Sequence, residues 1–194
     1  MISLVARRSV FLLFFTVASS HLSPNLCGQA VSSAKSGGIR SSWDLSKTLD
    51  SLIANCNRLR PVVEKVTPRD WMAKGAPQGY VDQHQLVLSQ LRSVAYVSQQ
   101  LAKDPEKLSL ALDLFMRLES LELNLQSFAE GARNYQNPAV AELIEGMRGE
   151  GASARSGLRD YVVELASAKE QEFKIVDNEA QKCRAQQLRS PKRR

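Results

Sequence analysis

The chain has 194 residues, 43% of them hydrophobic and 24% charged, and a net charge of +6 at pH 7. This mild basic excess gathers at the C-terminal end, in a predicted basic tail at 190–194, and no basic stripe interleaved with aromatic side chains occurs. The sequence therefore argues against nucleic acid as a partner. About 160 residues remain after an N-terminal signal is removed, which is the usual size of one domain.

The N-terminal end is typical of a secretory signal peptide. Two arginines precede the nine-residue apolar run 10–18. A helix needs about 20 residues to span a bilayer, so we expect this segment to be cleaved and not to act as an anchor. Small residues place the cut after Ser20 or after Ala30. Residues 1–30 are accordingly assigned to the signal peptide and its c-region.

Two other export signals are alternatives. Arg7-Arg8-Ser9 resembles the start of a twin-arginine signal, although the residues after it fit that motif poorly. Cys27 suggests a lipoprotein, but Pro24-Asn25-Leu26 lacks the small residues that lipid attachment needs. The sequence thus predicts an exported protein, periplasmic or extracellular. Residues 31–41, which contain Ser, Gly and Lys, are predicted to be a flexible lead-in.

The remaining chain, 42–189, repeats its apolar residues in alternating steps of 3 and 4, a pattern that we call a seam. No segment alternates with period 2. Steps of 3 and 4 place residues on one face of a helix. The sequence therefore predicts an all-α fold: an elongated antiparallel bundle of four long helices with one or two short ones.

The first long helix is followed by a short helical turn. The seam of the long helix consists of Leu45, Leu49, Leu52, Cys56, Leu59, Val63 and Val66. Thr67-Pro68-Arg69-Asp70 is typical of a helix start, and the turn that it opens carries Trp71. Gly75-Ala76-Pro77 ends this turn. Trp71 and Tyr80 flank the loop and are expected to be packing anchors at the end of the bundle. Should the protein bind a small molecule, we expect the surface of Trp71, Gly75, Pro77 and Tyr80 to be involved.

The second and third helices are predicted to form a hairpin that turns at Lys103-Asp104. The second has a seam of Tyr80, His84, Val87, Leu91, Val94, Ser98 and Leu101. The third has a seam of Leu108, Ala111, Phe115, Leu118, Glu122, Leu125, Ala129 and Ala132. Counting outward from the turn places residue 84 opposite residues near 123, so we expect His84 and Glu122 to meet inside the bundle. Such a pair could fix the register of the two helices, lie in solvent at the edge of the seam, or form a pH-responsive or ligand-binding site.

Asn137-Pro138 is predicted to cap a fourth helix. Glycines at 146, 149 and 151 either break that helix or let another backbone approach closely. The last helix is predicted from about Ala152 to Leu188. Its seam consists of Leu158, Val162, Leu165, Phe173, Val176, Ala180 and Cys183.

Cys56 and Cys183 are predicted to form a disulfide. A cut after Ala30 removes Cys27 and leaves these two cysteines in an oxidising compartment. If the two cysteines face each other across antiparallel helices, the other residues at matching levels also form apolar pairs. These pairs are Leu59 with Ala180, Val63 with Val176 and Val66 with Phe173. This register makes the start of the first helix project past the hairpin together with the end of the last. The alternative is two buried thiols that never meet.

No motif for catalysis, metal binding or cofactor binding emerges. A metal site in a bundle needs several carboxylates and histidines, and His84 is alone once His21 is lost with the signal peptide. There is no haem-attachment motif, glycine-rich phosphate loop or nucleophile elbow. We therefore expect no catalytic residue, no metal and no cofactor, with a hydrolase of unrecognised site as the alternative.

Three segments resemble uncharacterised exported helical proteins of soil bacteria: Thr67-Pro68-Arg69-Asp70-Trp71, Tyr161-Val162-Val163-Glu164-Leu165 and Glu179-Ala180-Gln181-Lys182-Cys183-Arg184. The resemblance covers most of the chain after the signal and implies no activity. By elimination, the sequence predicts an exported, non-enzymatic protein that binds a protein partner in the envelope or outside the cell, with no transmembrane segment after processing. The alternative is a carrier or sensor of a small apolar ligand held between helices.

Overall fold

The computed structural model describes residues 42–189, and the regular structure of this part is helical throughout. Its helices in chain order are α1 (Ser42–Glu64), α2 (Pro68–Met72), α3 (Gly79–Lys103), α4 (Leu108–Tyr135), α5 (Pro138–Glu150) and α6 (Ala152–Arg189). The expected signal peptide, lead-in and basic tail lie outside the described residues.

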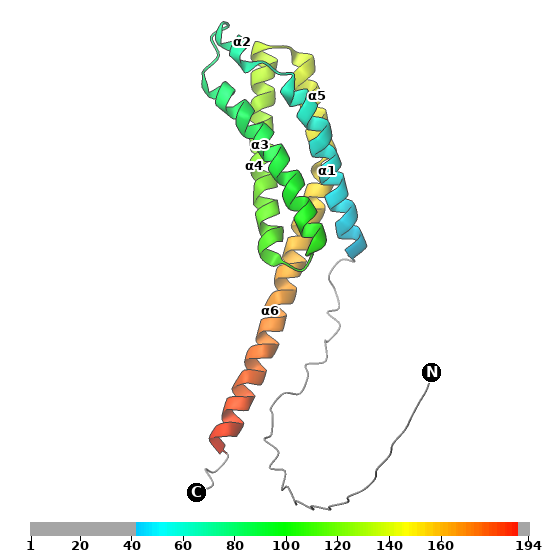
Figure 1. Cartoon of the computed structure of the whole chain (residues 1–194), viewed down its shortest axis with the longest axis vertical. Helices are drawn as coiled ribbons and strands as arrows, with labels where there is room; N and C mark the ends of the chain where they lie inside the picture. Colours follow the sequence, from blue (N-terminus) through cyan, green and yellow to red (C-terminus); the bar gives the residue numbers. More distant parts are fainter. Residues whose placement is uncertain (1–41, 190–194) are drawn as a thin grey trace, which may run out of the picture. The chain divides into compact units, whose positions relative to one another are not determined.

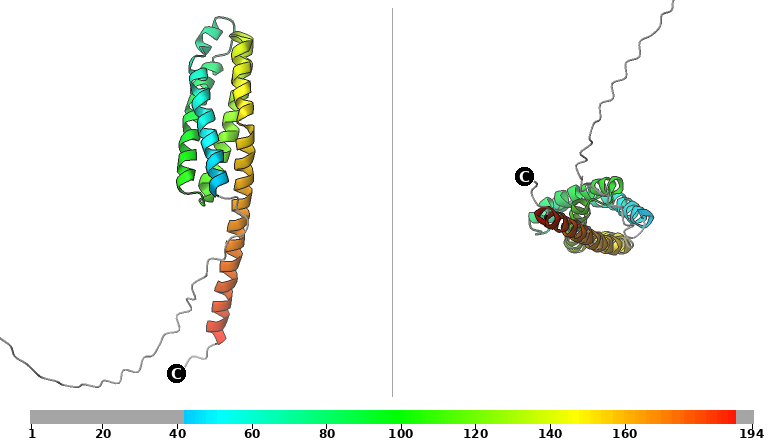
Figure 2. Two further views of the ribbon diagram at one scale, coloured as in Figure 1. Left: turned by 90° about the vertical axis from the view of Figure 1, so that its right-hand side faces the viewer. Right: turned by 90° about the horizontal axis from the view of Figure 1, so that it is seen from below.

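The long helices form an up-down-up-down bundle (Figure 1). α1 packs against α3, α3 against α4, and α4 against α5, while α6 packs against both α1 and α4 and closes the ring. Figure 2 shows the helices arranged around a common interior. The predicted all-α antiparallel bundle, with four long helices and shorter ones between them, is confirmed.

α5 and the start of α6 together form the fourth rod of this bundle, and the two helices run in nearly the same direction (Figures 1 and 2). The rod is broken at Gly151, whose backbone N–H donates to Arg148 O instead of continuing the regular ladder. The buried Asn55 of α1 donates to Met147 O at 2.8 Å and so satisfies a carbonyl at the break. A Cβ on Gly151 would lie 3.4 Å from Asn55 Oδ1, whereas one on Gly146 or Gly149 would meet nothing.

The seams form the core. All seven residues of the first seam, six in α1 and Val66 just after it, are buried, with exposed fractions of 4% or less. α4 is buried on more than one side, as its wide apolar face indicates, because Leu114, Leu121 and Phe128 are buried together with the seam residues Leu118 and Leu125. Burial of these apolar faces is the main source of stability in such a bundle.

The expected pairing of the start of the first helix with the end of the last is wrong. A Cβ on Gly157 would lie 3.2 Å from Thr48 Oγ1, and Arg58 contacts Glu150 at 2.8 Å. This register places the first turn of α1 beside α6 near residue 163. Beyond that level α6 continues as a rod past the turn between α3 and α4 (Figure 1). No helix between residues 42 and 189 is both long and apolar enough to cross a membrane.

Candidate interaction surface

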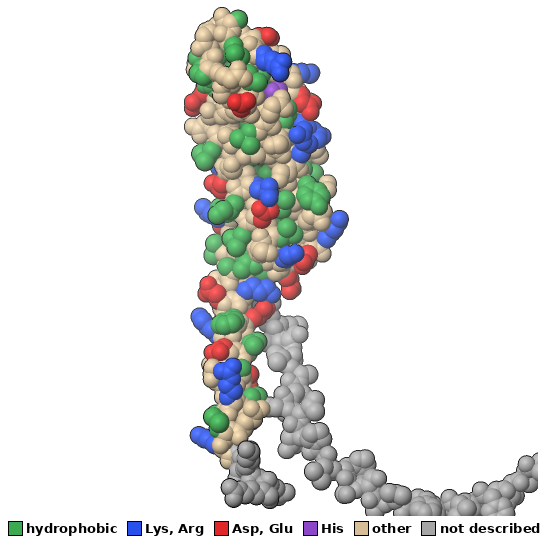
Figure 3. Space-filling view, turned by 60° about the vertical axis from the view of Figure 1, so that its left-hand side comes forward, with side chains coloured by type: hydrophobic (Ala, Val, Ile, Leu, Met, Phe, Trp, Pro, Cys, Tyr) green, Lys and Arg blue, Asp and Glu red, His purple; other side chains and the backbone are tan. Residues whose placement is uncertain are grey.

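α6 divides into two parts, which we call the bundle half (152–169) and the projecting half (170–189). In the bundle half, Leu158 and Leu165 have exposed fractions of 0%. In the projecting half, every residue is exposed except Cys183, which is half-buried. The exposed fractions reach 72% for Phe173 and 61% for Val176. Figure 3 shows hydrophobic side chains at the surface between acidic and basic ones along the part of α6 that extends beyond the bundle.

The projecting half begins where α6 passes the turn between α3 and α4. The Tyr161 hydroxyl donates to Pro105 O in that turn and fixes α6 against it. Lys169 Nζ lies 3.8 Å from Glu106 of the turn and 3.0 Å from Glu172 of α6. A shallow apolar hollow opens at this level and is lined by Leu108, Ala166, Lys169, Glu170, Phe173 and Lys174. The apolar seam of α6 therefore changes from buried to exposed where the helix passes the turn between α3 and α4, near Lys169.

Charge along the projecting half changes from acidic to basic. Residues 170–179 contain four acidic side chains and one basic side chain, whereas residues 180–189 contain three basic side chains and no acidic one. Glu179 and Lys182 form an ion pair of 2.8 Å across the middle of the segment. Its hydrogen bond raises the pKa of Lys182, and both groups remain largely exposed. The surface thus combines an apolar stripe with opposite charge at its two ends.

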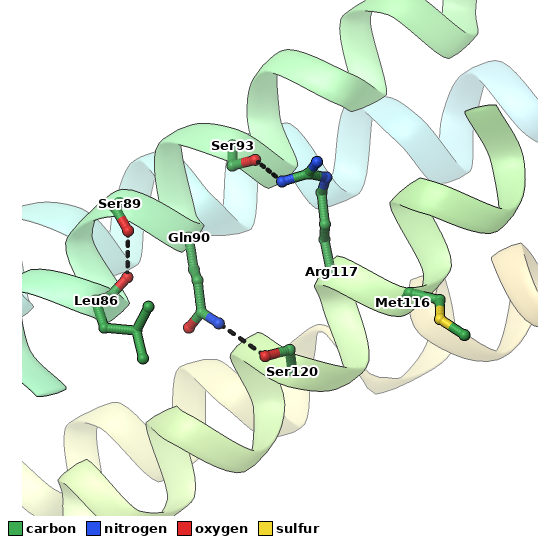
Figure 4. Close-up of a pocket in the computed structure, with 7 residues that line it drawn as sticks. All are labelled: Leu86, Ser89, Gln90, Ser93, Met116, Arg117 and Ser120. Carbon is green, nitrogen blue, oxygen red and sulfur yellow. Dashed lines mark hydrogen bonds between the residues drawn. The ribbon is translucent and has the colours of Figure 1, made fainter. Parts of the chain in front are cut away.

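A second group of exposed side chains lies between α3 and α4. The hollow there is lined by Leu86, Ser89, Gln90, Ser93, Met116, Arg117 and Ser120. Polar side chains bridge it: Gln90 donates to Ser120 at 2.8 Å and Arg117 donates to Ser93 at 2.8 Å (Figure 4). The bridges occupy the polar groups of the groove, and only Leu86 and Met116 present apolar surface at its edges.

The predicted contact between His84 and Glu122 is not formed. His84 Nε2 donates to Val63 O of α1 at 2.9 Å, and its ring stacks on Phe128. Glu122, with a side-chain exposure of 11%, instead pairs with Arg155 at 2.6 Å and with Arg148 at 3.4 Å. Hydrogen bonds between α3 and α4 confirm the expected level, since Gln83 reaches Asn124 O. The two side chains nevertheless turn to different neighbours, His84 towards α1 and Glu122 towards α5 and α6.

Trp71, one of the four residues of the loop surface that the sequence singled out, is a packing anchor of the bundle. Trp71 is 1% exposed, and its indole N–H donates to Gln136 Oε1 at 3.1 Å. Its ring lies against Tyr80, Phe128 and Tyr135. The structure therefore confirms the packing role of Trp71. Gly75 and Pro77 are exposed, and Gly75 has a positive φ of 87°, which a residue without a Cβ adopts at low cost.

The predicted disulfide between Cys56 and Cys183 is absent, and the register of α1 against α6 explains why. Cys56 lies near the level of Glu150, since Arg58 pairs with that residue. Cys183 lies 33 residues further along the chain, which corresponds to about 50 Å of helix. The Cys56 thiol is buried, and this desolvation raises its pKa to about 11.

Two features of this architecture were missed by sequence reasoning. The sequence analysis assigns no role to Gly131 of α4, yet a Cβ there would lie 2.5 Å from Tyr80 Cε1 and 3.0 Å from Trp71 Cζ3. The aromatic cluster needs a glycine at this position, and a glycine within a long helix was the available signal. Asn55 was the other omission, although a polar residue next to the buried Cys56 could have suggested a cap.

Comparison with family models, with curated proteins and with solved structures gives no match to this chain.

Proposed function

We propose that this chain is an exported, non-enzymatic protein that acts by binding another protein through the projecting half of α6. One observation carries the proposal: the apolar seam of α6 runs from the bundle half into the projecting half, but only its first part is covered. Phe173 and Val176 are on the same side of the helix as Leu158 and Leu165, which the bundle buries.

Physical chemistry favours a helical partner for this surface. A single helix of about 20 residues is marginally stable in water unless tertiary packing covers its apolar face. Apolar residues in steps of 3 and 4 are the pattern by which helices pair with each other or dock into grooves. A partner helix on Phe173, Val176 and Ala180 would remove them from water and support the helix at once.

Site-specific photocrosslinking tests this function. A photoreactive residue at Val176 lies on the seam, whereas one at Asn178 lies on the opposite side of the same turn and is the matched control. In cells that produce the protein, we expect a protein adduct from position 176 and none from 178. Equal adducts at both positions would contradict the proposal. An adduct only from a probe at Met116 would place the interaction at the α3–α4 groove instead.

Export rests on the N-terminal sequence, and it has its own test. The short apolar run behind two arginines predicts removal of the signal after Ser20 or Ala30. N-terminal sequencing of the protein from the envelope or the medium should find one of these two starts. An intact Met1 on protein from the cytoplasm would refute export but would leave the interaction surface standing.

A further inference from the structure

We propose that the projecting half of α6 pairs with the same segment of a second copy of this chain in an antiparallel, two-stranded contact. This inference rests on the function proposed above and names its partner. The apolar seam, the charge along it and the flanking residues each bear on the choice of partner or direction.

The seam supplies the contact. Phe173, Val176, Ala180 and Cys183 follow one another in steps of 3, 4 and 3, which is the spacing of the inward positions of a coiled coil. In a straight helix these residues continue the face on which α6 packs in the bundle. Two copies that present the same face can cover each other, because a two-fold contact uses one self-complementary patch twice.

The charge along the segment selects the direction. Residues 170–179 carry a net charge of −3 and residues 180–189 a net charge of +3. In an antiparallel pair, the acidic end of each copy faces the basic end of the other. In a parallel pair, the acidic ends lie together and the basic ends lie together, which is unfavourable. Residues 190–194 follow with three further basic side chains and extend the same asymmetry.

The residues beside the seam agree with this direction. Asp177 and Arg184 are seven residues apart and therefore share one flank of the helix, while Glu172 and Glu179 share the other. Antiparallel helices bring like flanks together, and the register that pairs Ala180 with Cys183 of the second copy sets Asp177 beside Arg184 twice by symmetry. Parallel helices bring unlike flanks together. They would set Glu172 against Asp177 and Glu179 against Arg184, so a repulsive and an attractive contact would offset each other.

The contact should be weak and reversible. The projecting half is 20 residues long, or about 30 Å of helix, so the pair buries less area than a standard interface of about 1,600 Å². We expect a dissociation constant on the order of ten micromolar, and a population of monomers that grows on dilution.

Sedimentation equilibrium of the purified full chain, as its host cell releases it, tests the pairing. We expect twice the monomer mass at high concentration and the monomer mass after dilution. Val176→Glu places a charge in the seam and should weaken the dimer at least about tenfold. Asn178→Glu adds the same charge on the opposite face and should leave the dissociation constant within about twofold. Circular dichroism checks that both variants remain helical. Equal effects of the two variants would overturn the inference.

Charge reversal tests the direction. In the antiparallel pair, Asp177→Arg places a second basic side chain against Arg184 of the other copy and should weaken the dimer, and adding Arg184→Asp should restore it. In a parallel pair, Asp177→Arg would instead face Glu172 and strengthen the dimer. Tighter association of the single variant would therefore overturn the antiparallel arrangement.

The test separates this inference from the function on which it rests. A protein that stays monomeric at all concentrations, while Val176 still crosslinks to a different protein, would refute self-pairing and leave the proposed function intact. An adduct from Val176 to residues 31–41 of the same chain would refute both, because the seam would then be covered within one molecule.

Discussion

Leu165 and Phe173 are both apolar and both belong to the seam of α6, yet one is fully buried and the other is 72% exposed. The bundle half has α1 and α4 beside it, and the projecting half has passed the end of both. The same helical pattern therefore stabilises the fold in one half and leaves apolar side chains exposed in the other. A seam indicates that one face of a helix is apolar and suited to pack against another element, but it does not show whether that element belongs to the same chain.

Truncating one seam residue in each half should give the largest difference. Leu165→Ala removes a fully buried side chain and should lower the free energy of unfolding by about 2–5 kcal/mol. Phe173→Ala removes an exposed side chain and should lower the free energy of unfolding of the monomer by less than about 0.5 kcal/mol. Urea unfolding at low protein concentration measures both. Comparable losses would mean that the projecting half packs against its own bundle.

The two cysteines extend the contrast to pH. Burial raises the pKa of Cys56 to about 11, so the folded state holds the thiol proton in a range where the unfolded chain has lost it. Stability from this thiol is complete below pH 9 and should fall by up to about 2–3 kcal/mol as the pH rises to about 11. Urea unfolding across this range provides the measurement. Cys56→Ala should flatten the decline, whereas Cys183→Ala, in the projecting half, should leave its slope unchanged. A slope that Cys56→Ala does not alter would contradict the assignment.

Acidic residues that pair with the two halves of α6 should also differ in how much they contribute to the free energy of unfolding. Glu122 pairs with Arg155 at 2.6 Å and with Arg148 at 3.4 Å where α6 joins the bundle. Glu122→Gln removes the closest carboxylate of Arg155, while Arg148 keeps Glu145 at 2.6 Å. We expect a loss of about 1–2 kcal/mol in the free energy of unfolding. Glu179 pairs with Lys182 in water, and Glu179→Gln should leave the unfolding of the monomer unchanged. A larger effect at 179 than at 122 would be inconsistent with the described packing.

The sequence alone predicts the bundle because periodicity reports which face of each helix is apolar. The seam of α1 is buried without exception for this reason, and Asn137 caps α5 as expected. Periodicity does not report which neighbour a face meets. His84 and Glu122 stand at matching levels of the hairpin, but His84 meets a carbonyl at the end of α1 and Glu122 meets two arginines.

The same limit explains the error at Cys56 and Cys183. Opposing seams of apolar residues match each other in several registers, so the apolar pairs built around these cysteines did not identify the true one. The register is set by contacts that periodicity does not encode, such as Asn55 at the Gly151 break and Thr48 beside Gly157. The exposure of the apolar stripe on the projecting half was not predicted from the sequence, because it depends on where α1 begins.

Removing the projecting half should have the smallest effect on the fold and the largest on association. A chain that stops after Lys169 keeps the hydrogen bond of Tyr161 to Pro105 and the buried part of the α6 seam. Its free energy of unfolding should match that of the full-length monomer within about 0.5 kcal/mol. The same truncation removes Phe173, Val176 and the charges on both sides of them, so self-association should vanish. Unfolding in urea and sedimentation of one preparation measure the two effects together. A truncated chain that still dimerises would move the contact into the bundle, and one that unfolds much more easily would make the projecting half part of the fold.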